Sequence, residues 1–75
     1  MSLFEFMSVC PNGPRIVLKD YNGGILVESA NKDQLEHFSS YELFYQHEKV
    51  ESFVADCQCI YIKLKFLADY GISIE

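Results

Sequence analysis

Apolar and polar side chains alternate along much of this chain, and a period of two is typical of strands that bury one face of a sheet. Two segments, 49–55 and 59–66, show the alternation, and two more, 15–20 and 25–29, are runs rich in β-branched residues. The run at 3–9 is also rich in apolar side chains, and its Phe4 and Phe6 would share one face of a strand. The pattern therefore predicts four or five short strands.

The Asn-Gly-Gly sequence at 22–24 separates the β-branched-rich runs 15–20 and 25–29. Asn-Gly is typical of a two-residue type I′ turn, because both residues tolerate positive φ. With that turn, Leu18 lies opposite Val27. The segment 10–14 before it contains two prolines and a glycine, which favour a loop. We therefore expect a β-hairpin over 15–29.

The last two alternating segments predict a second hairpin. Its register can be argued from side-chain pairing, because a slip of one residue turns every side chain to the other face. A three-residue loop at 56–58 gives a nearly continuous apolar face, with the pairs Val54–Ile60, Ser52–Ile62 and Val50–Leu64. The opposite face then has the pairs Phe53–Tyr61 and Glu51–Lys63. This register predicts two aromatic rings side by side, away from the core.

The segment 31–47 is the one helical candidate. Asn31 or Ser29 can cap a helix that starts near Lys32, and the serines at 39–40 can cap a second one. We expect one or two short helical segments here, packed on the sheet. The aromatic cluster at 41–45 is either core or a recognition surface, because Tyr is common at binding hot spots.

Together these elements predict an α+β fold: a small antiparallel sheet of four to five strands with one short helical connector packed on one face. The 75 residues form a single domain, 1–75. A chain this short buries only about 60% of the surface that its unfolded form exposes. The tail at 67–75 is either a short final strand or disordered.

Acidic side chains outnumber basic ones by 11 to 6, for a net charge of −5. This balance argues against direct binding of nucleic acid, which requires a basic footprint, and against an anionic membrane surface. A candidate acidic patch lies in the middle of the chain: Glu28, Asp33, Glu36, Glu42 and Glu48. The patch is either solvated surface or a surface aimed at a basic partner.

Three cysteines and a start without a signal-peptide pattern predict a cytoplasmic protein with reduced thiols. No apolar run approaches the roughly 20 residues of a membrane span. Cys57 and Cys59 are one residue apart, and further candidate ligands are Cys10, His37 and His47, but their spacing matches no regular metal motif. We expect no cofactor, metal or catalytic residue.

The order of features resembles short uncharacterised proteins carried on phages and conjugative elements of Gram-positive bacteria. The resemblance covers roughly 15–64 and depends on Asp20, Gly23, Leu26, Glu28, Tyr41, Leu43, Val50, Glu51, Ser52, Phe53, Ile60 and Ile62. The usual Asp-Asn turn before the last strand is replaced here by Asp56-Cys57-Gln58. The resemblance implies an accessory protein of a mobile element, and it transfers no functional residue.

By elimination, the sequence predicts a small acidic interaction module, not an enzyme, that binds another protein or a second copy of itself as a homodimer. The predicted interaction face consists of Glu51, Phe53, Cys59, Tyr61 and Lys63. One alternative is an inhibitor whose acidic patch mimics nucleic-acid charge in a basic groove. Another is a metal- or thiol-dependent protein that uses Cys57, Cys59, His37 and His47.

Overall fold

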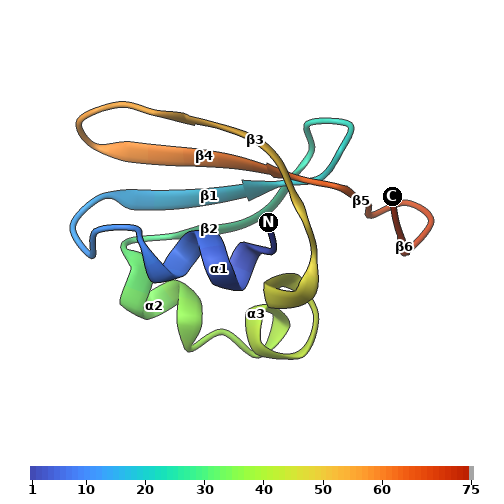
Figure 1. Cartoon of the computed structure of the whole chain (residues 1–75), viewed down its shortest axis with the longest axis horizontal. Helices are drawn as coiled ribbons and strands as arrows, with labels where there is room; N and C mark the ends of the chain where they lie inside the picture. The colour runs from blue at the N-terminus through green and yellow to red at the C-terminus, as the bar shows by residue number, and fades with distance from the viewer. Residues whose placement is uncertain (75) are drawn as a thin grey trace.

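The computed structural model describes residues 1–74, which form a four-stranded sheet with three short helices on one side (Figure 1). The strands are β1 Arg15–Lys19, β2 Ile25–Ser29, β3 Val50–Ala55 and β4 Cys59–Leu64. The helices are α1 Leu3–Ser8, α2 Lys32–Glu36 and α3 Ser39–Leu43, followed by a 3-10 turn, η1, at Tyr45–His47. A separate small hairpin pairs β5 Phe66–Leu67 with β6 Ile72–Ser73. The predicted α+β class is confirmed.

The sheet is mixed, which corrects the expectation of an antiparallel sheet. The strand order is β2-β1-β4-β3, and β4 runs parallel to its neighbour β1. Each predicted hairpin forms, and the two hairpins join through these central strands. Alternation along a strand indicates which face of the strand is buried, but it does not indicate whether the neighbouring strand runs parallel or antiparallel.

The segment at 3–9 is a helix, so the strand predicted there is wrong. Ser2 and Glu5 form a capping box: the Ser2 hydroxyl accepts the Glu5 backbone N–H at 3.2 Å, and the Glu5 carboxylate accepts the Ser2 backbone N–H at 3.1 Å. Leu3, Phe6 and Met7 are buried, with the spacing of one helix face. Phe4 is exposed, because its position, about 100° around the helix from Leu3, lies outside this buried face.

The first hairpin has the predicted pairing of Leu18 with Val27, but its turn is longer than expected. Among the described residues only glycines have positive φ, so Asn22 is not in a type I′ turn. Asp20 organises the loop instead. Its Oδ1 accepts the backbone N–H groups of Asn22 at 3.0 Å and Gly24 at 2.8 Å. Gly23, with φ of +91°, provides the reversal.

The second hairpin departs from the predicted register. Val50 lies opposite Leu64 as expected, but a bulge between Val50 and Ser52 shifts the pairing that follows by one residue. The expected pairs Val54–Ile60, Ser52–Ile62, Phe53–Tyr61 and Glu51–Lys63 are therefore wrong. The observed pairs are Ser52–Lys63, Phe53–Ile62, Val54–Tyr61 and Ala55–Ile60. Phe53 shares the face that the helices cover, and Val54 points to the other face.

The core lies between the helices and one face of the sheet. Its buried members are Leu3, Phe6, Met7, Ile16, Leu18, Leu35, Tyr41, Ile60, Ile62 and Leu64. The helical segments predicted at 31–47 are confirmed as α2, α3 and η1. None of the described helices is long and apolar enough to cross a membrane.

Candidate functional site

The predicted interaction face is divided between the two sides of the sheet. On β4 the residues with even numbers enter the core, so Cys59, Tyr61 and Lys63 lie on the face away from the helices. We call this the open sheet face. Phe53 points to the helical side, where its ring lies 4.8 Å from that of Phe6. Glu51 lies in the bulge and its carboxylate is 3.7 Å from the Lys65 ammonium.

The predicted acidic patch is divided as well. Asp33 and Glu36 lie on α2, Glu42 lies on α3 and Glu48 follows η1, so four of the acids belong to the helical layer. Glu28 lies on β2 opposite Val17 and lines a hollow of the open sheet face. The sequence places these five residues close together along the chain, but a strand and two helices carry them to different sides.

The candidate metal and thiol ligands do not gather. Cys10, Cys57 and Cys59 are all free thiols, and only Cys59 is buried. Among residues 1–74 no group of three or more Cys, His, Asp or Glu side chains could hold a metal ion. His37 is exposed on the protein surface, where its Nδ1 lies 2.7 Å from the Asp33 carbonyl oxygen.

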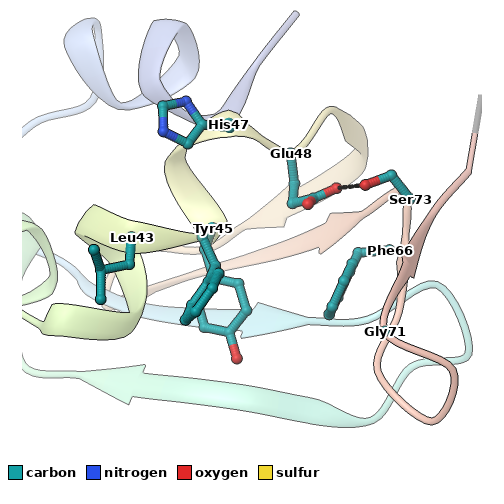
Figure 2. Close-up of a pocket in the computed structure, with 8 residues that line it drawn as sticks. Leu43, Tyr45, His47, Glu48, Phe66, Gly71 and Ser73 are labelled. Carbon is teal, nitrogen blue, oxygen red and sulfur yellow. Dashed lines mark hydrogen bonds between the residues drawn. The ribbon is translucent and has the colours of Figure 1, made fainter.

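A hollow of about 490 Å³ lies between the α3–η1 segment and the β5–β6 hairpin, and we call it the C-terminal groove (Figure 2). Four apolar or aromatic side chains line it: Leu43, Phe44, Tyr45 and Phe66. The other lining residues are polar or glycine: His47, Glu48, Gly71 and Ser73. Leu43 and Phe44 are 65% and 61% exposed. The aromatic cluster at 41–45 is thus partly core, through buried Tyr41, and partly surface.

Contacts between distant segments hold the groove in shape. The rings of Tyr45 and Phe66 meet edge to face with centroids 6.2 Å apart. The Ser73 hydroxyl donates to the Glu48 carboxylate at 2.6 Å, as the dashed line in Figure 2 shows. Gly71, with φ of +64°, makes the turn between β5 and β6. Sequence reasoning missed this site because its two walls, 43–48 and 66–73, are separated by seventeen residues of chain.

The groove contains a hydroxyl (Ser73), a carboxylate (Glu48) and an imidazole (His47), the three groups of a catalytic triad, but they are not hydrogen-bonded as in a triad. In such a triad the histidine lies between the hydroxyl and the carboxylate. Here the Ser73 hydroxyl donates to Glu48 directly. Figure 2 shows the His47 ring projecting in a different direction from Tyr45. The arrangement therefore closes the rim of the groove and does not activate the serine.

Comparisons with protein-family models, with curated proteins and with solved structures find no match to this chain. The candidate binding surfaces of the protein are therefore the two described above, the C-terminal groove and the open sheet face.

Proposed function

We propose that the protein is a small interaction module, not an enzyme, and that it binds a segment of a partner protein in the C-terminal groove. The observation that carries the proposal is the exposure of Leu43 and Phe44 beside Tyr45 and Phe66. Contiguous apolar side chains at a concave site are typical of protein-binding surfaces, because their burial by a partner removes apolar area from water.

The charge around the groove supports a partner segment that is apolar and basic. Glu48 lines the groove, Glu42 lies on the adjoining α3, and none of the lining residues is Lys or Arg. The net charge of −5 favours the approach of a cationic segment. An aliphatic or aromatic anchor can fill the hollow while a neighbouring Lys or Arg faces these carboxylates.

Selection from a displayed library of random peptides tests the proposal. We expect the selected peptides to share an aliphatic or aromatic anchor next to Lys or Arg. The Leu43→Ser/Phe44→Ser variant should weaken the binding of a selected peptide at least about tenfold, because two anchor contacts are lost. Binding is measured by fluorescence anisotropy with the purified peptide.

The matched control is Val9→Ser/Val54→Ser, which removes two exposed apolar side chains outside the groove. This control should bind the selected peptide as the wild type does. Equal affinity for the wild type and the groove variant would refute the groove as the binding site. If the wild type instead sediments as a dimer that the groove variant dissociates, the occupant is a second copy of the chain, and the partner-segment proposal fails.

We do not extend the proposal to mimicry of nucleic-acid charge. That function requires the five acids on one surface, whereas Glu28 lies on the open sheet face. The acids on α2 are also flanked by Lys32 and His37, and the Lys32 ammonium donates to the Cys10 carbonyl at 3.3 Å.

A further inference from the structure

We infer that the open sheet face is a second binding surface, which takes an acidic segment of a partner protein through Lys19 and Lys63. The hollow between these side chains shares no residue with the C-terminal groove. The inference therefore does not depend on the function proposed for the groove.

Lys19 and Lys63 are direct neighbours across the parallel pair of β1 and β4. Like charges in directly opposed positions destabilise a sheet. Neither lysine is in an ion pair, since the ion pairs between described residues are Lys65–Glu51 and His37–Asp33. Two lysines at paired positions, neither in an ion pair, form a site that an external anion would stabilise.

The two faces of the molecule differ in charge. The open sheet face carries Arg15, Lys19 and Lys63, which are half of the six Lys and Arg residues in the chain. Its acids, Glu28 and Asp56, line a different hollow of this face, together with Arg15 and Lys19. The helical layer on the other side carries acids on both α2 and α3. The hollow at Lys19 and Lys63 is lined by no Asp or Glu, so a chain with an excess of acids has a local basic site there, which is complementary to a negatively charged partner segment.

Ser52 extends the row of donors across the sheet. It lies opposite Lys63 on β3, so Lys19, Lys63 and Ser52 occupy neighbouring positions on three adjacent strands. Neighbouring strands are about 4.8 Å apart. A hollow of about 180 Å³ lies between these side chains, Tyr61 and Val54. A carboxylate in it can accept from an ammonium and from a hydroxyl together.

The apolar residues of this face favour an acidic peptide over a nucleic acid. Binding of single-stranded nucleic acid uses aromatic rings on which bases stack. The hollow is lined by two aromatic residues, Tyr61 and Phe53. The Phe53 ring packs against Phe6 on the helical side, and the Lys19 ammonium already lies 5.2 Å from the Tyr61 ring centroid, so neither ring is a free platform for a base. Val54 is exposed next to Tyr61 and can contact aliphatic side chains of a peptide.

The test uses a fluorescein-labelled peptide in which glutamate alternates with valine, and fluorescence anisotropy as the readout. We expect saturable binding that weakens as salt is raised, because screening reduces the attraction between charges. Lys63→Gln and Lys19→Gln should each weaken this binding about tenfold, the effect of one lost charge-assisted hydrogen bond. A peptide with glutamine in place of glutamate should not bind.

The matched control is Lys49→Gln, which removes the same charge outside the open sheet face and should leave the affinity unchanged. Equal losses in all three variants would overturn the inference, because they would report net charge alone. Tighter binding of a single-stranded oligothymidylate than of the acidic peptide would refute the acidic segment as the ligand and identify nucleic acid in its place. Self-association of the wild type that Lys63→Gln abolishes would make the occupant a second copy, and it would equally refute the partner segment.

Discussion

The ring of Phe53, on the edge strand β3, packs against the ring of Phe6, on α1, with centroids 4.8 Å apart and planes inclined at 60°. This contact joins an edge of the sheet to the helical layer. It forms because the bulge after Val50 turns Phe53 to the same side as Ile62. Phe53 nevertheless remains 55% exposed, so the contact covers only part of the ring.

A double-mutant cycle measures this contact. Phe6→Leu and Phe53→Leu are expected to show a coupling of about 0.5–1.5 kcal/mol in the free energy of unfolding, the range for tilted aromatic pairs. Urea denaturation of the wild type, both single variants and the double variant gives the coupling. The pair Phe53→Leu with Phe44→Leu is the control and should be additive, because Phe44 lies at the groove. Additivity in the first cycle would mean that the rings do not touch.

Asp20 is expected to stabilise both its own loop and the groove. It is buried, its Oδ1 accepts the backbone N–H groups of Asn22 and Gly24, and its Oδ2 accepts that of Ala68 at 3.4 Å, after β5. Asp20→Ala should lower the free energy of unfolding by about 1–3 kcal/mol, because these donors lose their acceptor. Asp20→Asn retains one acceptor oxygen and should lose less. Urea denaturation compares the two variants, and equal stability of both with the wild type would contradict the role of Asp20.

The hydroxyl group of Tyr41 is expected to contribute nothing to the stability of the fold. The side chain is 3% exposed and its hydroxyl has no hydrogen-bond partner among the described residues. Burial raises the pKa of Tyr41 to about 12. Tyr41→Phe should therefore leave the free energy of unfolding unchanged or raise it by up to about 1 kcal/mol. Urea denaturation measures the change, and a loss above about 1 kcal/mol would show that the hydroxyl has a partner.

The pKa of His37 is expected to lie above the usual value for a histidine. The Asp33 carbonyl oxygen, 2.7 Å from Nδ1, and then the Asp33 carboxylate raise the pKa of His37 above 6.5. A pKa raised by folding contributes stability below the unfolded pKa, and this contribution is lost as the pH rises through the folded pKa. His37→Gln should therefore destabilise the protein at about pH 5 and not at about pH 8. Proton NMR titration of the imidazole checks the direction, and a folded pKa below 6.5 would refute it.

Local features of the chain were predictable because nearby residues decide them. The pairing of Leu18 with Val27 followed from the turn signal at 22–24, although the turn is longer than the two residues expected. The start of α2 followed from Asn31, whose side chain accepts the Gln34 backbone N–H at 2.8 Å. The capping box of Ser2 and Glu5 is equally local, and a sequence analysis that used this signal would have found α1.

The sequence by itself determined the α+β class, both hairpins and the position of the α2–η1 helical segment, since these depend on turns, caps and hydrophobic period. The tertiary structure decided that β1 and β4 run side by side in parallel, that a bulge turns Phe53 inward, and that Lys19 and Lys63 become neighbours. Those outcomes depend on packing between segments that are far apart in the chain. In particular, they depend on which face of the sheet the helices cover. Alternation along a single strand contains no information about that choice.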